Sequence, residues 1–177
     1  MLYHFSPKYT DAHLGVQLST PKESFYWTQK LTKNWVPKMA ITTGNQAVDD
    51  AVKGVAPLIS HGKYTAELLK EFVFEDIRQQ EFPLKPSRRR CLFAFAFNDP
   101  NAYAAKLQFP RDKYQLFSVS AEPDARIHYA DLACLDVNLL DYSGYVAAAR
   151  KYWNGADPNS INTEVLLEGA FMLSRVV

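Results

Sequence analysis

The chain of 177 residues is 47% hydrophobic and 22% charged, a composition that fits one globular domain over 1–177 and excludes a disordered chain or a coiled coil. Its 20 Lys and Arg residues nearly balance its 19 Asp and Glu residues. The formal net charge of +1 excludes a uniformly basic surface for nucleic acid or membranes, although it leaves room for a local basic patch. With only 7 glycines and neither a GxGxxG nor a GxxxxGKS/T motif, the sequence argues against a glycine-rich nucleotide-binding loop.

The first half of the chain is expected to be mainly helical after one short strand. Residues 2–6 are β-forming side chains followed by a proline, which predicts a strand. Three helices are predicted to follow, over 20–35, 45–59 and 64–80. The third has the clearest pattern, with Glu and Arg on one face and, on the other, an apolar stripe of Leu68, Leu69, Phe72, Val73 and Ile77.

The second half is expected to consist mainly of strands. A proline-bounded loop over 81–90 leads into a strongly apolar strand over 91–97. Helices are predicted over 100–107, where Asn and Asp favour a helix start, and over 139–153. Because helices precede strands without regular alternation, the pattern indicates an α+β fold. The remaining strands are predicted over 114–120, 126–130, 163–168 and 170–177.

Nothing in the sequence indicates a membrane span or an export signal. No run approaches the roughly 20 apolar residues that cross a bilayer, and the N-terminus lacks the apolar stretch of a signal peptide. Cys91 and Cys134 form no CxxC pair and lie in apolar surroundings, which favours two buried thiols in a reducing compartment. We therefore expect a soluble, cytoplasmic protein with no membrane partner; delivery into a target cell without a cleaved signal stays open.

Metal and thiol chemistry receive little support. The four histidines lack the spacing of a metal-binding motif, so no metal site is predicted. Cys91 follows three arginines that could activate a thiolate. It also begins an apolar strand, so a buried thiol is the preferred interpretation.

The loop before residue 91 carries an unusual density of positive charge. Lys85, Arg88, Arg89 and Arg90 fall within six residues of a nearly neutral protein. Guanidinium groups bind phosphate through paired donors, so this loop is a candidate phosphate-binding segment; a solvated basic turn is the alternative. Because alternate residues of a strand face opposite sides, at most two of these arginines line one pocket.

Two further candidates lie in strands near the two ends of the chain. Glu164 and Glu168 share a face with Leu166, either on the solvated face of an edge strand, which is the commoner case, or in a cleft. His4 stands among aromatic residues, where a structural histidine is commoner than a catalytic one. The neighbouring aromatic side chains of residues 3 and 5 are expected to point away from His4 toward the core.

Together these features resemble the bacterial ADP-ribosyltransferase-like superfamily. There an early strand often reads aromatic-His-aromatic-Ser/Thr, and a late strand carries the catalytic glutamate before Val-Leu, as in Leu2–Ser6 and Glu164–Leu166. The chain is also similar to a little-characterised branch with a Phe-Pro-x-x-Pro-Ser-Arg loop before Cys-Leu-Phe-Ala, a Tyr-Trp-x-Gly motif and a Glu-x-Leu-x-Glu-Gly motif. The matching segments are 82–88, 91–94, 152–155 and 164–169.

The resemblance implies two packed, mainly antiparallel sheets with a helical N-terminal half, and a cleft that binds NAD. It implies transfer of ADP-ribose to a protein or nucleic-acid acceptor with loss of nicotinamide, as in a toxin, effector or phage-conflict enzyme. Glu164 would stabilise the oxocarbenium-like transition state at the nicotinamide ribose, with Glu168 as the rival carboxylate.

The resemblance also implies roles for the residues that bind NAD. His4 would hydrogen-bond the adenosine ribose or the nicotinamide amide. Ser87 and Arg88 would hold the pyrophosphate or a ribose, and Phe93 or Tyr103 would stack on nicotinamide. Together with Ser6, beside His4, these are the six NAD-binding residues that the resemblance implies.

The chain departs from the superfamily at two places, and two alternatives stay open. The usual Ser-Thr-Ser motif is absent, with Pro86–Arg88 as its substitute, and Asn162 stands two residues before Glu164, so protein-arginine specificity is not expected. One alternative is a non-catalytic nucleotide- or RNA-binding module on the same fold. The other is a phosphotransferase acting on RNA, in which arginines dominate the site.

Overall fold

The computed structural model describes residues 1–6, 14–20, 69–96, 98–106, 115–136 and 142–176. The helices predicted over 20–35 and 45–59, and the start of the helix predicted over 64–80, lie outside the described residues. The expectation of a helical N-terminal half therefore stays a prediction. The described part is an α+β structure, as the sequence pattern indicated, and it has two antiparallel sheets, as the resemblance implied.

The larger sheet has four antiparallel strands in the order β1-β4-β7-β2. The predictions located three of these strands to within two residues at each end. They missed β2, because a three-residue edge strand is too short to show an alternating pattern. The strands are β1 (Leu2–Ser6), β2 (Gln17–Ser19), β4 (Gln115–Ala121) and β7 (Ala170–Arg175).

The smaller sheet has three antiparallel strands in the order β3-β6-β5. It consists of β3 (Leu92–Ala94), β5 (Arg126–Asp131) and β6 (Thr163–Glu168). The strand predicted over 91–97 is shorter, because β3 ends at Ala94 and Phe95 makes only an isolated bridge, to Tyr3 of β1. This bridge brings β1 of the larger sheet beside the end of β3.

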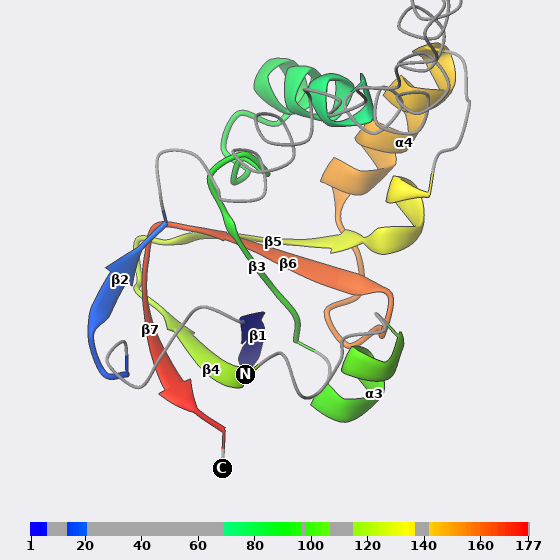
Figure 1. The fold of residues 1–177 in the computed structure, drawn as a ribbon. Coiled ribbons are helices and arrows are strands. Elements are labelled where there is room, and N and C mark those ends of the chain that lie inside the picture. The colour runs from blue at the N-terminus through cyan, green and yellow to red at the C-terminus, as the bar shows by residue number, and fades with distance from the viewer. Residues whose placement is uncertain (7–13, 21–68, 97, 107–114, 137–141, 177) are drawn as a thin grey trace, which may run out of the picture.

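Four helical segments are described. The helix over 69–81 and α4 (Tyr142–Asn154) lie on one side of the three-stranded sheet, which separates them from the four-stranded sheet (Figure 1). The shorter segments are α3 (Pro100–Lys106) and the 3-10 turn η3 (Leu132–Leu135). Asp99 caps α3, since its Oδ1 accepts hydrogen bonds from the backbone N–H groups of residues 101 and 102.

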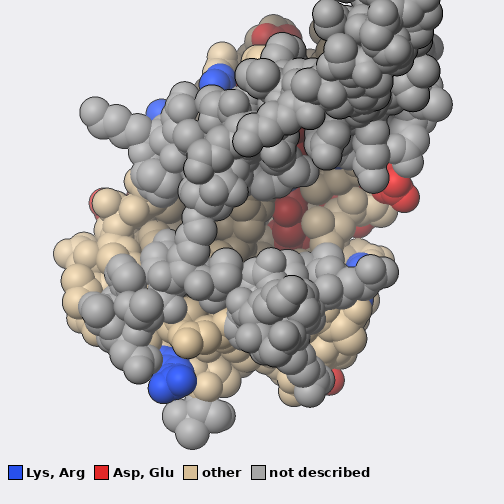
Figure 2. All heavy atoms as spheres, in the orientation of Figure 1, with Lys and Arg blue, Asp and Glu red and all other residues tan. Residues whose placement is uncertain are grey.

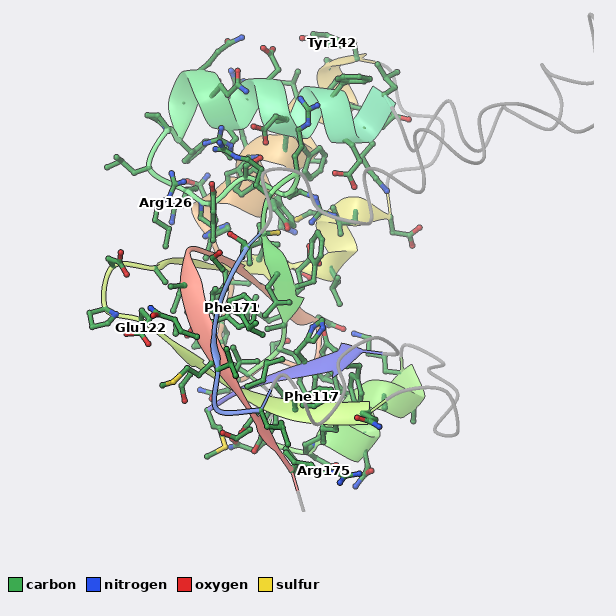
Figure 3. All side chains as sticks on the ribbon, turned by 60° about the vertical axis from the view of Figure 1, so that its left-hand side comes forward. Phe117, Glu122, Arg126, Tyr142, Phe171 and Arg175 are labelled. Carbon is green, nitrogen blue, oxygen red and sulfur yellow. The ribbon has the colours of Figure 1, made fainter. Side chains whose placement is uncertain are left out.

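Two apolar cores lie on opposite sides of the three-stranded sheet. Val165 and Leu167 of β6 point toward the four-stranded sheet, where they pack with Phe117 and Phe171 (Figure 3). Leu166 points the other way, toward the helices. The helix-side core also contains Phe74 and Ile77 of the 69–81 helix and Tyr152 and Trp153 of α4.

The 69–81 helix buries Val73 and Ile77 of its predicted apolar stripe and differs from the prediction in the rest. Leu69 and Phe72, assigned to the apolar stripe, are exposed, whereas Glu71, Glu75 and Arg78 are buried. These charged residues recur at positions i, i+4 and i+7, so they form one face of the helix. That face packs against the loop over 82–90 through side-chain hydrogen bonds rather than against solvent.

Gly169 carries the chain from one sheet to the other. It lies between β6 and β7 with a φ of 134°, a conformation that glycine adopts more readily than other residues. A Cβ atom at this position would lie 2.9 Å from the Cα atom of Ala125. The glycine at the end of the Glu-x-Leu-x-Glu-Gly motif is therefore required by the backbone.

Candidate functional site

A buried arginine lies at the centre of the helix-facing side of the three-stranded sheet. The loop over 82–90 turns inward at Pro86–Arg88, so that Arg88 is only 5% exposed. Its Nε and Nη2 atoms donate to the two carboxylate oxygens of Glu71, at 2.9 and 3.1 Å. Its Nη1 atom donates to Glu164 and to the hydroxyl of Tyr152. Three elements and the loop thus meet at one guanidinium group.

Aromatic rings flank this guanidinium group. The Cζ atom of Arg88 lies 5.1 Å from the ring centres of both Phe93 and Tyr152, within the range of a cation–π contact. The Phe93 ring therefore lies against Arg88 in this structure, and its implied stacking on nicotinamide stays a prediction. We name the four residues Glu71, Arg88, Tyr152 and Glu164 the Arg88 cluster.

Glu164 is buried, in contrast to the solvated position that is commoner for a strand carboxylate. It is 7% exposed because β6 is the central strand of its sheet, with the helices on the side toward which Glu164 points. Its Oε1 atom accepts hydrogen bonds from Arg88 and Tyr152. Its Oε2 atom has no hydrogen-bond partner in the described part of the chain. Figure 2 shows Asp or Glu atoms at the bottom of a recess on this side of the molecule.

The protonation states in the cluster follow from burial and charge. Burial alone would lower the pKa of Arg88, but the carboxylates of Glu164 and Glu71 outweigh it and raise that pKa well above its ordinary value. Burial raises the pKa of the Tyr152 phenol, with Arg88 opposing and Glu164 adding to the rise. Tyr152 therefore stays protonated and donates to Glu164. Two carboxylates share one guanidinium, which leaves the cluster one negative charge in excess.

Ser87 and Glu168 form a second set of contacts beside the cluster. The Oγ atom of Ser87 donates to Glu75 at 3.0 Å, and its backbone N–H donates to Oε2 of Glu168 at 2.7 Å. Glu75 also holds Arg78, at 2.9 and 3.1 Å, and the pKa of Glu75 is lowered because these hydrogen bonds outweigh the effect of burial. The polar groups of Ser87 and Arg88, expected to hold NAD, are thus engaged within the protein.

His4 does not lie on the same side as Glu164. It pairs across from Phe117, whose side chain belongs to the core between the sheets, whereas Glu164 shares the helix-facing side with Leu166. The Nδ1 atom of His4 donates to the backbone carbonyl of Phe93 at 2.7 Å. Burial lowers the pKa of His4 despite this bond, so the imidazole is neutral at pH 7. This histidine ties β1 to β3, and Ser6 closes β1 opposite Gln115.

The aromatic residues of β1 lie closer to the Glu164 side than its histidine does. Tyr3 and Phe5 stack on Phe95, with ring centres 5.4 and 5.1 Å apart, and Phe95 stacks on Tyr103 at 4.2 Å. Because Ala94 pairs with Val165, one further step in this antiparallel register places residue 95 opposite residue 164. The Tyr103 hydroxyl donates to the backbone carbonyl of Thr163 at 3.3 Å, and burial, with a contribution from Glu164, raises the pKa of its phenol.

The cysteines are buried and unpaired, as expected. Burial raises the pKa of the Cys91 thiol well above its ordinary value, only partly opposed by Arg88, and this favours a buried neutral thiol over an activated thiolate. In the described ranges, no group of three or more His, Cys, Asp and Glu residues is arranged to hold a metal ion. No helix within those ranges is long and apolar enough to cross a membrane.

Sequence reasoning missed Glu71 and assigned Tyr152 no role at the site. The spacing of Glu71, Glu75 and Arg78 on one helix face was the available signal, but such a stripe is also the pattern of a solvated face. Tyr152 was noticed as part of the Tyr-Trp-x-Gly motif. Only the fold shows that both side chains meet Arg88.

Comparisons with known proteins give a family and no activity. No curated protein matches the chain. The model of the DUF2441 family, described as a protein of unknown function, matches residues 17–177, which is most of the chain. The match includes β3 to β7 and the whole Arg88 cluster. The chain therefore belongs to the DUF2441 family.

Proposed function

We propose that this protein is an NAD-dependent ADP-ribosyltransferase whose catalytic carboxylate is Glu164. One observation carries the proposal: a carboxylate more than nine-tenths buried, with Oε1 held by Arg88 and Tyr152 and Oε2 without a partner among the described residues. Buried carboxylate oxygens are normally hydrogen-bonded. A hydroxyl of the nicotinamide ribose is the donor that this chemistry would supply.

The reaction breaks the bond between C1′ of the ribose and the nitrogen of nicotinamide. Nicotinamide leaves with the bonding electron pair, and the ribose becomes oxocarbenium-like. The negative charge of Glu164 stabilises this state, and its Oε2 atom orients the ribose hydroxyl. An oxygen or nitrogen of the acceptor then bonds to C1′ and gives up its proton to Glu164 or to water. When water is the acceptor, the product is free ADP-ribose.

In this proposal Arg88 and Tyr152 are positioning residues. The role implied for Arg88 by resemblance, holding the pyrophosphate, fits its contacts less well, because four of its five N–H groups are engaged by Glu71, Glu164 and Tyr152. Together, the hydrogen bonds from Arg88 and Tyr152 fix the orientation of the Glu164 carboxylate. Preorganised charge of this kind is a large contributor to catalysis.

The arrangement of strands also supports the proposal. The strand with the aromatic-His-aromatic pattern and the strand with the glutamate flank β3 on either side, through the pairs Tyr3–Phe95 and Ala94–Val165. We assign the planar nicotinamide to the aromatic cluster near Glu164 in which Phe95 stacks on Tyr103 of α3 and on the two aromatic side chains of β1. His4 supports this surface through its bond to Phe93. We further propose a cytoplasmic enzyme acting on a protein or nucleic-acid acceptor, in the manner of a toxin, effector or phage-conflict enzyme.

The first test measures nicotinamide released from NAD by the purified protein. We expect Glu164→Gln to lower the rate by about 100-fold or more, because it removes the charge aimed at the oxocarbenium-like state. Glu81→Gln is the matched control, since Glu81 is exposed and pairs with Arg150 away from the cluster; we expect a rate within about twofold of the wild type. Undiminished turnover by Glu164→Gln would remove Glu164 from the mechanism.

Glu168→Gln distinguishes the two carboxylates of β6. If it abolishes turnover while Glu164→Gln does not, the catalytic role passes to Glu168. Labelled NAD incubated with cell lysate, followed by separate nuclease and protease digestion, identifies the class of the acceptor.

One observation favours a competing function. The engagement of Ser87 and Arg88 within the protein also suits a non-catalytic nucleotide- or RNA-binding module, in which the Arg88 cluster only stabilises the fold. This alternative predicts ligand binding with no release of nicotinamide. The same engagement argues against an RNA phosphotransferase that depends on Arg88.

A further inference from the structure

Two arginines meet one carboxylate where β5 begins. The Nη2 atom of Arg126 lies 2.8 Å from Oε1 of Glu168, and the Nη2 atom of Arg90 lies 3.1 Å from the same oxygen. Arg126 pairs with Glu168 across the β5–β6 ladder, and Arg90 ends the loop over 82–90. Figure 3 shows Arg126 at the boundary between the helices and the three-stranded sheet. The two guanidinium groups are therefore neighbours at this boundary.

The Glu168 carboxylate, which contacts both arginines, is itself held by the backbone of the 82–90 loop. The Glu168 side chain is 11% exposed, and its Oε2 atom accepts the backbone N–H of Ser87 at 2.7 Å. Ser87 is in turn held by the buried Glu75. The two arginine side chains are 47% and 41% exposed. A largely buried, anchored carboxylate thus holds two partly exposed guanidinium groups beside one oxygen atom.

The positive charge of the two arginines exceeds the negative charge of the carboxylate that they share. Two guanidinium groups share one carboxylate, and the Nε and Nη1 atoms of both have no partner among the described residues. The ammonium group of Lys85 has no ion pair there either, and it is close enough to His128 of β5 to help lower the pKa of that histidine. These three cations follow the edge strand β5 of a protein whose formal net charge is only +1.

We propose that Arg90 and Arg126 form a phosphate clamp that binds the backbone of a single-stranded nucleic acid, with Lys85 extending the same surface. Guanidinium groups bind phosphate through paired donors in a fixed plane, and both arginines offer such donors. A single small phosphate gains little here, because Glu168 offsets half of the charge. A chain of phosphates gains from each cation that it passes.

The clamp deepens the proposed function, on which this step rests, by assigning the acceptor class. Glu164 and Glu168 lie on one face of β6, four residues apart, which is about 13 Å along a strand. A nucleic acid held at the clamp has its backbone within a short reach of Glu164. A single strand is specified because a base or ribose must leave a duplex stack to approach a carboxylate as buried as Glu164.

The test measures binding by fluorescence anisotropy, without NAD, between the purified protein and labelled single-stranded RNA and DNA of about 20 nucleotides. Salt is varied from about 50 to about 200 mM. We expect the double variant Arg90→Gln, Arg126→Gln to raise Kd by at least about tenfold. It should also reduce the slope of log K against log salt by about one for each arginine. Both side chains are partly exposed, and thermal melting checks that the variant is folded.

Arg150→Gln is the matched control, because Arg150 is an exposed arginine of α4 that also pairs with a glutamate. We expect its Kd to stay within about twofold of the wild type. An equal loss of affinity in Arg150→Gln and in the double variant would show general charge attraction and overturn the clamp. So would tighter binding of a phosphopeptide of equal charge, or of duplex, than of single strands. A wild-type protein that cleaves NAD but binds neither oligonucleotide overturns the clamp alone, whereas binding without NAD cleavage overturns only the proposed reaction.

Discussion

The two faces of the three-stranded sheet are built from the same strands and differ in what holds them. On the face toward the four-stranded sheet, Val165 and Leu167 of β6 meet Leu92 and Ala94 of β3 in a mainly apolar core. On the face toward the helices, the alternate residues of β6 include Glu164 and a second glutamate, and the contacts are hydrogen bonds and ion pairs as well as apolar packing.

This difference suggests that the inter-sheet face serves mainly stability and that the helix-facing side is the one suited to chemistry. Apolar burial is non-directional, so the inter-sheet face tolerates any well-packed set of side chains of similar volume. The helix-facing side depends on specific partners, because a buried charge is costly unless it is paired and hydrogen-bonded. Two apolar cores would suffice for a fold of this size. The presence of Glu164, Arg88 and Glu71 in one of them is what marks that face as the candidate site.

Of the substitutions on the helix-facing side, the removal of Arg88 should lower the free energy of unfolding most. Arg88→Met keeps the length of the side chain but leaves Glu71 and Glu164 buried without their cation, and we expect the free energy of unfolding to fall by about 3–5 kcal/mol. Urea unfolding followed by circular dichroism measures this change. On the apolar face, Leu167→Ala should cost about 2–5 kcal/mol through the lost transfer energy and the cavity.

A rescue experiment separates the two kinds of loss. Adding Glu71→Gln and Glu164→Gln to Arg88→Met removes the unpaired charges, and we expect it to recover much of the stability. No such rescue is available for Leu167→Ala. If the triple variant were no more stable than Arg88→Met, the loss would come from packing at Arg88 rather than from uncompensated charge.

The strand that forms the apolar face could be predicted from the sequence, whereas the contacts of the charged face could not. The strand at 163–168 was predicted with the bounds of β6, because its apolar run is a local signal. The burial of Glu164 was not, since its partner Arg88 lies 76 residues away and no local pattern records that pairing. Likewise, Glu71 and its neighbours on the 69–81 helix have the spacing of a solvated face, and only the position of the 82–90 loop buries them.

The role of His4 shows a similar limit. Alternation along β1 was enough to predict that the aromatic side chains and the imidazole point to opposite sides. Which side faces Glu164 depends on the bridge from Tyr3 to Phe95, which no short-range pattern predicts. The register between strands therefore decides which half of a motif reaches the site.

Acidification should lower the free energy of unfolding by a smaller amount, chiefly through His128 on the helix-facing side. His128 pairs across from Leu166, on the helix-facing side, and donates through Nε2 to the carbonyl of Tyr152 at 3.0 Å. Burial, with a contribution from Lys85, lowers its pKa from 6.5 to about 4, although the bond to Tyr152 opposes this. Between these two values the unfolded chain binds a proton that the folded protein does not. The stability contributed by neutral His128 is complete above pH 6.5 and is lost as the pH falls toward 4.

We expect this loss to be on the order of 2 kcal/mol, measured as urea midpoints at several pH values. His4, whose pKa is also lowered, acts in the same direction. His128→Gln keeps a donor near Tyr152 but cannot be protonated, so part of the pH dependence should disappear. An unchanged pH profile in that variant would assign the effect to other groups.

Tyr152→Phe should have the smallest effect on stability and is the sharpest probe of the charged face. It keeps the ring that packs on Phe74, Trp153 and Arg88 and removes only the hydroxyl that donates to Glu164. Because Arg88 still holds Glu164, we expect a loss of about 1 kcal/mol in the free energy of unfolding. If Tyr152 positions the catalytic carboxylate, the turnover number for NAD should fall by about tenfold while KM stays nearly constant, because the lost interaction matters mainly in the transition state. A structural hydroxyl would lower stability and leave both kinetic constants as they were, so the ratio of the two effects measures how far this face serves chemistry rather than folding.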